Sequence, residues 1–307
     1  MRYWAGITDW DWFRFLRARQ PLDEVNFWQP SAGRAPVRLE RGTLFLFKLH
    51  ASAGGEIVGG GFFIRYSALP VRLTWETFGE GNGAATFDEM VARIGRYRRR
   101  PIDVHADQVG CLVLVQPFFL DEPDWIPAPA DWAPNIVQGK TYDSDIGPGR
   151  QLWERIQAAL AAGPAAQQAH AIAEERYGAP VLVQPRLGQG AFRVEVLDAY
   201  ARRCTITGER TLPALDAAHI RPYAELGPHR LENGLLLRKD LHALFDAGYL
   251  TVTPSLELRV SGRIREEFEN GRDYYALEGA PLRLPLPPNP PPSPVYLEWH
   301  GDTVFRG

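Results

Sequence analysis

The chain has 307 residues, of which 45% are hydrophobic and 23% charged, and this composition is typical of a folded globular protein with two domains of ordinary size. Its formal net charge of −3 excludes an overall basic field, so any nucleic acid must be held by local patches. The two distant cysteines, Cys111 and Cys204, exclude a disulfide framework and a four-cysteine zinc site, and the lack of a long apolar run predicts a cytoplasmic protein that does not enter a membrane.

Residues 1–145 predict a domain built mostly from short β-strands. Several short apolar or alternating runs are separated by Gly, Pro and Asn, which is the pattern that strands and their turns produce. These runs lie at 3–8, 42–50, 56–66, 69–75 and 109–119. The stretch 121–149 is rich in Pro, Asp and Gly and predicts an extended connection at the end of this domain.

Helical segments are expected inside and after this domain. Residues 86–98 predict a helix, because a Thr-x-x-Glu capping box begins the segment and its apolar side chains recur on one face. Residues 146–180 are rich in Ala and Gln and predict a helical linker that is broken at Gly163 and Pro164. Residues 281–307 begin with a proline-rich run, which predicts an extended C-terminal segment on the surface.

The most informative polar residues lie in the C-terminal half. His219 follows a short apolar segment, and a loop leads from it to Asn233. Residues 232–248 predict a turn and an amphipathic helix, on which His242 and Asp246 are one turn apart and project from the same side. A histidine at a strand end, facing a helix that carries His and Asp, outlines a metal-centred hydrolytic site. In such a site the helix residues hold a cation and the strand histidine takes a proton from water.

This pattern resembles the HNH nuclease family, which has the ββα-metal fold. Family members have a His-Ile-x-Pro element, an Asn after a short loop, and His or Asn nine residues later. Here these elements are HIRP at 219–222, Asn233 and His242, and residues 186–208 resemble the segment that precedes them in HNH domains of restriction-like proteins. The resemblance implies an HNH nuclease domain over 181–280.

The resemblance also implies roles for individual residues in phosphodiester hydrolysis. His219 corresponds to the general base that activates water, and Asn233 corresponds to the asparagine that braces the loop by hydrogen bonds. His242 corresponds to a metal ligand. Asp246 is then expected to be a second ligand or to orient His242.

One departure from the family pattern concerns the metal. Many members place Asp or His directly before the base, where this chain has Ala218; Asp216 or water is expected to take that place. Mg²⁺ is the expected ion, with Mn²⁺, Ni²⁺ or Co²⁺ as alternatives. Cys204 stands where zinc-bearing relatives have the first cysteine of a CxxC pair, but Thr207 replaces the second, so no structural zinc is expected.

Five further polar side chains are candidate contacts to DNA, because planar guanidinium groups match phosphate oxygens. They are Arg186, Gln189, Arg193, Arg221 and Arg238. Plainer interpretations exist for all these residues. A single arginine is more often a solvated charge, the Asn-Gly at Asn233 is also a turn signal, and His242 with Asp246 can be a solvated helix pair. His219 alone can be a buried structural histidine, and His229 is expected on the surface.

Residues 1–145 resemble the PUA-like group of β-barrel modules, which includes the EVE, ASCH, YTH and SRA domains. The order matches: a first strand with Trp, a Gly-Thr-Leu strand, then an Ile-Val-Gly-Gly-Gly strand. The resemblance implies a pocket with aromatic walls that holds a modified base flipped out of the duplex. The candidate pocket residues are Asp9, Trp10, Trp12, Asn26, Phe27, Trp28, Gln29 and Trp75. Residues 9–13 and 26–30 are expected in loops, although most tryptophans in a small barrel are core residues.

Together these observations predict an α+β protein with an N-terminal PUA-like barrel, a helical linker and a C-terminal HNH domain. This architecture resembles modification-dependent restriction endonucleases. It implies a metal-dependent enzyme that binds double-stranded DNA with modified bases, methylated or hydroxymethylated for example, and cuts nearby as a homodimer. Two alternatives stay open: a reader of modified nucleic acid with weak or no catalysis, because of Ala218, and an RNA-directed nuclease, because PUA-like modules often bind RNA. The basic run 96–101 could follow a phosphate backbone or be a solvated helix end.

Overall fold

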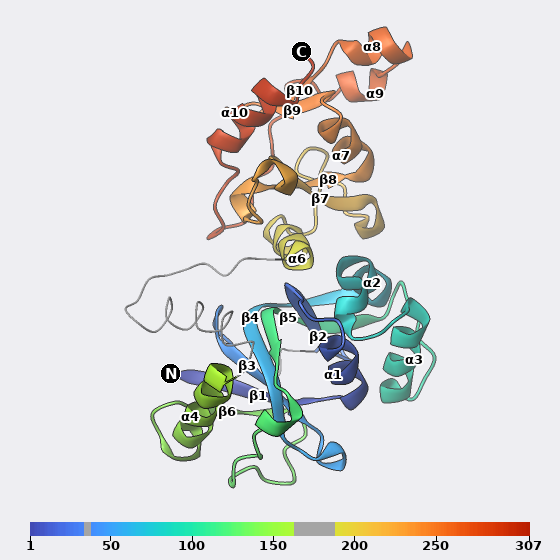
Figure 1. The fold of residues 1–307 in the computed structure, drawn as a ribbon. Helices are drawn as coiled ribbons and strands as arrows, with labels where there is room; N and C mark the ends of the chain where they lie inside the picture. The colour runs from blue at the N-terminus through green and yellow to red at the C-terminus, as the bar shows by residue number, and fades with distance from the viewer. Residues whose placement is uncertain (34–37, 163–187) are drawn as a thin grey trace. The chain divides into compact units, whose positions relative to one another are not determined.

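The chain divides into two compact units, Met1–Arg186 and Leu187–Gly307 (Figure 1). The computed structural model describes residues 1–33, 38–162 and 188–307. Arg186, a predicted DNA contact, and residues 163–180 of the predicted linker lie outside the described residues. Within the described parts of the chain, no helix is both long and apolar enough to cross a membrane.

The N-terminal unit is built on one mixed six-stranded sheet, with the strand order β2-β5-β4-β3-β1-β6. Its strands are β1 (Arg2–Thr8), β2 (Glu24–Gln29), β3 (Leu44–Leu49), β4 (Ile57–Pro70), β5 (Gln108–Phe119) and β6 (Gly139–Asp143). β1 and β3 run parallel, and the other neighbours pair antiparallel. Among the described residues the sheet is open, because β2 and β6 are its two edges. The predicted closed barrel is therefore not confirmed, and β6 lies inside the stretch predicted to be an extended connection.

Four helices accompany this sheet: α1 (Trp10–Arg17), α2 (Val71–Phe78), α3 (Phe87–Arg98) and α4 (Gly147–Ala162). In Figure 1, α4 lies beside β6, and α2 and α3 lie toward the opposite edge of the sheet. The predicted helix over 86–98 is confirmed as α3. The Thr86 hydroxyl accepts from the backbone N–H of Glu89 at 3.2 Å, and the Glu89 carboxylate accepts from the N–H of Ala85 at 2.9 Å.

Two predictions about local structure in this unit were wrong. The run 69–75 was expected to be a strand, but the chain leaves β4 at Pro70 and forms α2, because Val71, Leu73 and Thr74 are the residues that face the interior. A run of this length is too short to distinguish the period of a strand from that of a helix. Residues 9–13 and 26–30 were expected in loops, but they belong largely to α1 and β2.

Aromatic side chains fill the core between α1 and the sheet. Trp12 packs edge-on against Phe47 on β3 with ring centroids 5.1 Å apart, and Phe13 packs against Phe119 on β5 at 5.9 Å. All four side chains are buried. The helix begins at Asp9, whose carboxylate accepts from the backbone N–H of Trp12 at 3.0 Å and so caps the helix. Burial of this cluster accounts for part of the aromatic richness of the N-terminal sequence.

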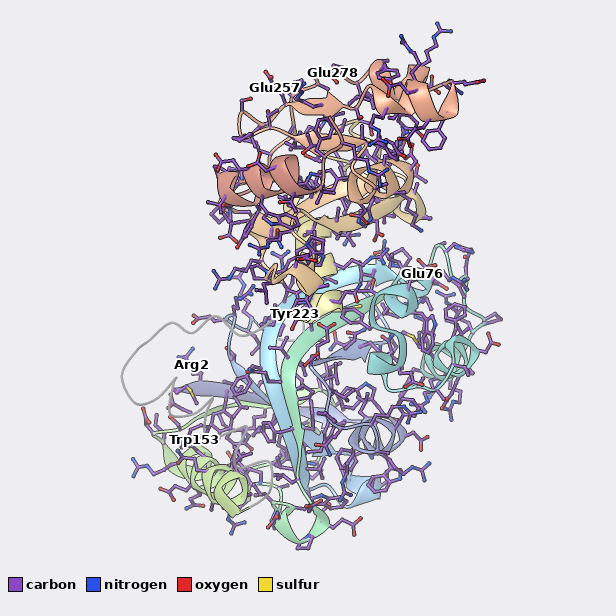
Figure 2. All side chains as sticks on the ribbon, turned by 45° about the horizontal axis from the view of Figure 1, so that its top comes forward. Arg2, Glu76, Trp153, Tyr223, Glu257 and Glu278 are labelled. Carbon is purple, nitrogen blue, oxygen red and sulfur yellow. The ribbon has the colours of Figure 1, made fainter. Side chains whose placement is uncertain are left out.

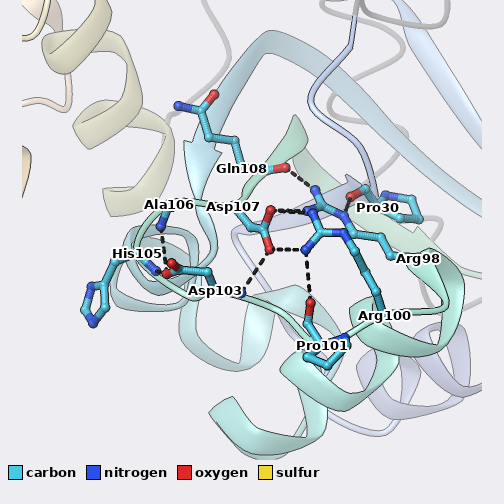
Figure 3. Close-up of polar contacts among 9 residues, drawn as sticks. All are labelled: Pro30, Arg98, Arg100, Pro101, Asp103, His105, Ala106, Asp107 and Gln108. Carbon is cyan, nitrogen blue, oxygen red and sulfur yellow. Dashed lines mark hydrogen bonds and ion pairs between the residues drawn. The ribbon is translucent and has the colours of Figure 1, made fainter.

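The basic run 96–101 is largely committed to internal contacts (Figure 3). Arg98 contacts the Asp107 carboxylate at 2.9 Å and donates to the carbonyl of Pro30, and Arg100 donates to both Asp107 oxygens at 2.6 and 2.8 Å. The hydrogen bonds from Arg100 are the main reason that the pKa of Asp107 is lowered to about 2. Half of the arginines in this run therefore fasten the connection between α3 and β5.

The C-terminal unit contains two short hairpins and a set of helices. β7 (Leu215–His219) pairs antiparallel with β8 (Gly234–Arg238), and β9 (Leu250–Val252) pairs with β10 (Leu258–Val260). The helices are α6 (Gln189–Ala199), α7 (Lys239–Asp246), α8 (Arg263–Phe268), α9 (Arg272–Tyr275) and α10 (Pro294–Thr303). The predicted helix through 232–248 is shorter than expected, because its first apolar residues form β8 instead.

Helix α7 ends where the sequence predicts. Gly248 has φ of +79° and donates to the carbonyl of Phe245, and the N–H of Tyr249 donates to the carbonyl of Leu244 at 2.8 Å. This is the Schellman arrangement, in which a residue in the left-handed region closes the helix. The turn fixes the last residues of α7, including Asp246, relative to β9.

The proline-rich C-terminal segment is fastened to the rest of its unit. The N–H groups of Arg283, Leu286 and Ser293 donate to the carbonyls of Thr205, Ala199 and Glu232, at 2.8 to 2.9 Å. The segment then forms α10, which lies beside β9 and β10 in Figure 1. Its His300 side chain is only 2% exposed.

Candidate functional site

Helix α6, strand β7 with the loop that follows it, helix α7 and the end of α10 surround a cavity of about 500 Å³. The β7–β8 hairpin brings the end of β7 next to α7, so residues far apart in the sequence face one space. Six of the residues predicted to act in catalysis, metal binding or DNA contact line this cavity: Gln189, Arg193, Asp216, His219, His242 and Asp246. Ala218 is fully buried and supplies no metal ligand. Among the residues that line the cavity, Asp216 is the one that brings a carboxylate from β7.

His242 stands between two carboxylates. Its Nδ1 lies 3.2 Å from Asp216 on β7, and its Nε2 lies 3.3 Å from Asp246, one turn later on α7. Burial lowers the pKa of His242, but the hydrogen bond that its ring donates to Asp216 and the charges of both carboxylates outweigh burial and raise the pKa overall. Arg193 on α6 completes the cluster, with its guanidinium 3.5 Å from Asp216.

The two carboxylates differ in their electrostatic environment. Burial raises the pKa of Asp216, but the hydrogen bond that its carboxylate accepts from His242 and the charge of Arg193 lower the pKa overall. Burial and the nearby charge of Asp216 raise the pKa of Asp246, and His242 only partly opposes this. Negative charge is thus concentrated at this wall of the cavity, and a cation placed there would relieve the repulsion between the carboxylates.

The donor chemistry of this cluster fits a divalent cation, although its present arrangement is not that of a formed metal centre. Among the described residues, no three His, Cys, Asp or Glu side chains are grouped as a metal centre requires. Both ring nitrogens of His242 contact carboxylates, so ligation by His242 requires one of these contacts to be exchanged for the ion. Carboxylate and imidazole are nevertheless the ligands that borderline and hard divalent ions share.

His219, at the end of β7, is held by rings on two sides. Its imidazole stacks on Phe192 of α6, with centroids 3.9 Å apart and planes 15° apart, and its Nε2 lies 2.9 Å from Nδ1 of His229. Burial, followed by the nearby charges of His229 and His242, lowers the pKa of His219 to about 4. His219 is therefore neutral at pH 7, which is the form that can accept a proton.

Asn233 is fully buried and braces the loop between β7 and β8. Its Oδ1 accepts from the N–H of Arg221 at 2.8 Å, and its Nδ2 donates to the carbonyls of Arg221 and Pro228 at 2.9 and 3.0 Å. One side chain thus satisfies three backbone groups on two segments of the loop. This is the bracing arrangement that the family resemblance implies for this residue.

Gly234 has a packing role that the turn signal does not explain. Its backbone is extended, with φ of −126°, and it pairs with His219 across the hairpin. A Cβ at this position would lie 2.6 Å from Val196 and 3.0 Å from the ring of Phe192. Glycine is favoured here because Val196 and Phe192, the ring that stacks on His219, occupy the space that a side chain would need.

Residues 204–253 match the HNH_2 family, described as HNH endonuclease. The matched stretch contains Asp216, His219, Asn233, His242 and Asp246. Residues 204–253 are an HNH endonuclease domain. No curated protein matches the chain.

Three solved structures are similar to this chain at low TM-scores. An ASCH protein from Zymomonas mobilis, crystallised as a mutant, has a TM-score of 0.35 and 10% identity, covering 49% of this chain and 96% of its own. The modification-dependent restriction endonuclease TagI has a TM-score of 0.31 and 16% identity, covering 92% of this chain and 76% of its own. The type IV phosphorothioation-dependent restriction endonuclease ScoMcrA has a TM-score of 0.20 and 11% identity, covering 78% and 45%. Scores this low do not establish a shared fold.

Two predicted DNA contacts of the HNH domain are engaged away from the cavity. The Arg221 guanidinium donates to the carbonyl of Glu225 at 2.6 Å and lies over the ring of Trp299, 5.1 Å from its centroid. Arg238 pairs with Asp240 at 2.9 Å. Neither lines the cavity that contains the HNH residues.

Three of the predicted modified-base residues in the N-terminal unit are largely interior. Trp12 is 4% exposed and Asn26 is fully buried. The Trp12 ring nitrogen donates to the carbonyl of Asn26 at 3.2 Å, and the Asn26 amide donates to Asn82 at 2.9 Å. Phe27 packs on Trp12 and on Phe45, with ring centroids 5.4 and 4.8 Å away. In this structure these side chains stabilise the core.

The remaining five are less buried and come from the start of α1, from β2 and from α2. They are Asp9, Trp10, Trp28, Gln29 and Trp75. Asp9 accepts from the hydroxyl of Tyr97 at 2.7 Å, and the ring nitrogen of Trp28 donates to the carbonyl of Asn82 at 2.9 Å. Trp10 is 37% exposed. The modified-base pocket stays a prediction.

Sequence reasoning missed three residues that shape the HNH site. Phe192 and His229 both contact His219, and Tyr223 stacks on His229 with centroids 4.7 Å apart. His229, expected on the surface, is half-buried against His219. The one available signal was a second histidine just before the bracing Asn233; nothing in the sequence distinguished Phe192 from an ordinary core residue.

Proposed function

We propose that this protein is a metal-dependent DNA endonuclease whose HNH domain hydrolyses phosphodiester bonds near a modified base that the N-terminal unit recognises. The observation that carries the proposal is that an HNH domain presents a neutral histidine, His219, in one cavity with a carboxylate–imidazole cluster. These are the two components that hydrolysis of a phosphodiester needs: a base for water and a place for a cation.

His219 is suited to the role of general base. Its lowered pKa keeps the ring unprotonated at neutral pH, and Phe192 restricts its orientation by stacking at 3.9 Å. In the proposed step, the ring nitrogen that does not contact His229 takes a proton from a water molecule as that water attacks phosphorus. A fixed ring orientation favours the reaction, because the base need not be ordered when the transition state forms.

HNH nucleases generally use divalent metal ions, and the HNH domain of this chain has residues that could hold one. His242, Asp216 and Asp246 are the candidate ligands, since their donor atoms converge on one wall of the cavity. A bound divalent ion supplies Lewis-acid stabilisation of the charge that develops on the phosphate and the leaving oxygen. Asp216 is the proposed replacement for the Asp or His ligand that many family members have at the position of Ala218. Mg²⁺ is the ion we propose.

Gln189 and Arg193, which line the cavity, are the proposed contacts to DNA phosphates. Gln189 is exposed at the start of α6, and Arg193 follows one turn later on the same helix. The Nε of Arg193 is buried without a hydrogen-bond partner among the described residues, although the same guanidinium contacts Asp216. An anion entering the cavity would satisfy this donor.

Recognition of a modified base is the part of the proposal that concerns the N-terminal unit. Its support is the resemblance of residues 1–145 to PUA-like modules and the presence of partly exposed aromatic rings, Trp10, Trp28 and Trp75, that could stack on a base. We propose that the enzyme acts in restriction of foreign DNA. A homodimer, with one HNH domain for each strand, also stays a proposal.

Digestion of a panel of duplex DNAs tests this function. The panel contains unmodified, methylated, hydroxymethylated and glucosylated DNA, each incubated with Mg²⁺, Mn²⁺ or EDTA. We expect cleavage of at least one modified class, no cleavage with EDTA, and weak or no cleavage of unmodified DNA.

Substitution of the carboxylate on β7 tests the metal site in the same assay. Asp216→Asn is expected to reduce cleavage and to raise the metal concentration needed for half-maximal rate. Asp240→Asn, which alters a partly exposed carboxylate on α7 outside the cavity, is the matched control and should leave both unchanged. Binding of modified DNA without cleavage under any metal would instead indicate a reader.

A further inference from the structure

We propose that His229 is a positioning residue that fixes the tautomer of His219, so that the water-facing nitrogen of the base carries a lone pair. This inference rests on the proposed function, because it gives His219 the role of general base. It concerns a loop residue to which neither the family pattern nor the sequence analysis assigned a role.

The contact between the two histidines has only two neutral arrangements. His219 Nε2 and His229 Nδ1 are 2.9 Å apart, so one must donate its hydrogen and the other must accept it. If His219 donates, its Nδ1 keeps a lone pair and can take a proton. If His229 donates, His219 must carry its hydrogen on Nδ1, and that nitrogen cannot act as a base.

The intrinsic chemistry of imidazole favours the productive arrangement. A neutral histidine side chain prefers the tautomer with hydrogen on Nε2. When His219 donates from Nε2, His229 accepts at Nδ1 and keeps its own hydrogen on Nε2, so both rings adopt this preferred form. In the opposite arrangement both rings adopt the less stable form. Nδ1 of His219 has no hydrogen-bond partner in the described residues, and its side chain lines the cavity.

The loop holds His229 in place for this contact. Tyr223, 65% exposed and labelled in Figure 2, stacks on the His229 ring with planes 9° apart. The residue before His229 is Pro228, whose carbonyl accepts from the buried Asn233 amide at 3.0 Å. The bracing asparagine therefore anchors the backbone next to His229, and Pro228 and His229 link Asn233 to His219.

The hydrogen bond also supports the reaction step. As water attacks, its O–H bond breaks, the proton forms a new bond to Nδ1 of His219, and the hydroxide oxygen bonds to phosphorus. The bond between phosphorus and the leaving 3′-oxygen breaks, and that oxygen keeps the electron pair and takes a proton from solvent. His219 becomes an imidazolium that still donates from Nε2 to the neutral His229. This bond is then charge-assisted and stronger than before, provided that His229 stays neutral in this step, because a positive charge on His229 would oppose protonation of His219.

Two substitutions separate this role from a purely structural one. His229→Asn keeps an acceptor, because Asn Oδ1 can occupy the position of Nδ1, but it loses the ring that stacks on Tyr223. His229→Phe keeps the stacking ring and loses the acceptor. We expect His229→Phe to lower the single-turnover cleavage rate roughly 10- to 100-fold with unchanged DNA affinity. His229→Asn should retain most of the wild-type rate, and His50→Phe, at an exposed histidine of the N-terminal unit, should retain all of it. The reverse order, with Phe more active than Asn, would overturn the proposal.

Ring-nitrogen NMR of the free protein gives a test that does not depend on cleavage. We expect the His219 ring to carry its hydrogen on Nε2 in the wild type and in His229→Asn, and to show a mixture of tautomers in His229→Phe. Hydrogen on Nδ1 of His219 in the wild type would refute the positioning role. A wild-type protein that shows the expected tautomer but cleaves no DNA would refute the proposed function alone.

Discussion

Replacement of Asn233 by alanine tests the loop that organises the HNH domain. The Asn233 side chain is fully buried and makes three hydrogen bonds, at 2.8, 2.9 and 3.0 Å, to the N–H and C=O of Arg221 and the C=O of Pro228. Each buried polar group left without a partner costs about 1–3 kcal/mol. Because the loop lies partly at the surface, water should satisfy some of these groups after the substitution. We therefore expect Asn233→Ala to destabilise the local structure by about 3 kcal/mol.

Amide hydrogen exchange measures this cost separately in each unit of the chain. A loss of about 3 kcal/mol corresponds to roughly 100-fold faster exchange in peptides from β7, β8 and the loop between them. Peptides from β5, in the N-terminal unit, provide the internal control and should not change. Asn135→Ala, at an exposed asparagine, is the control variant. A change of less than threefold in the loop peptides would show that Asn233 does not hold the loop, and the bracing argument would fail.

Two further predictions concern packing and pH. Gly234→Ala places a Cβ 2.6 Å from Val196 and should cost about 1–3 kcal/mol by overpacking; the same exchange experiment measures it, and adding Val196→Ala should recover part of the loss. If the double variant is no more stable than Gly234→Ala, the clash does not cause the loss. Burial lowers the pKa of His300 to about 4, so between that pH and about 6.5 the unfolded chain binds a proton that the folded chain does not. The free energy of unfolding should therefore rise by roughly 3 kcal/mol from this group as pH increases from 4 to 6.5, and level off above that range. Urea unfolding of His300→Gln should show a shallower pH dependence than wild type, whereas the exposed His105→Gln should match wild type; equal slopes in all three would contradict the assignment.

The parts of the HNH site that could be predicted from sequence are those specified by short, local spacing. His242 and Asp246 share a helix face because they are four residues apart, and His219 lies at a strand end because a proline follows a short apolar run. The Asn-Gly pair predicted a turn followed by a helix, but Gly234 has an extended backbone and begins β8. Each of these signals lies within one element or its immediate boundary.

The contacts between elements could not be predicted in the same way. Phe192 reaches His219 from α6, and together with Val196 it fills the space that a side chain at position 234 would need. His229 contacts His219 only because the loop folds back on the strand that precedes it. No periodicity encodes such approaches, since they depend on how separate segments pack.

The N-terminal unit shows the same limit in its secondary structure and closure. Segments 9–13 and 69–75 are short enough to fit a loop, a strand or a helix. Burial of the Trp12 and Phe13 rings in the first segment, and of the aliphatic side chains of Val71 and Leu73 in the second, determines the outcome. Strand patterns predicted the sheet but not whether it closes, because closure depends on the twist and register of all strands together.

The most direct test of the account is the single-turnover rate at which the wild type and His219→Ala cleave modified duplex DNA with saturating Mg²⁺ or Mn²⁺. If His219 is the general base, removal of its ring should slow cleavage roughly 10²- to 10⁴-fold while DNA affinity and metal dependence are retained. His50→Ala should cleave at the wild-type rate. Cleavage by His219→Ala at the wild-type rate would contradict the assignment of this cavity as the hydrolytic site.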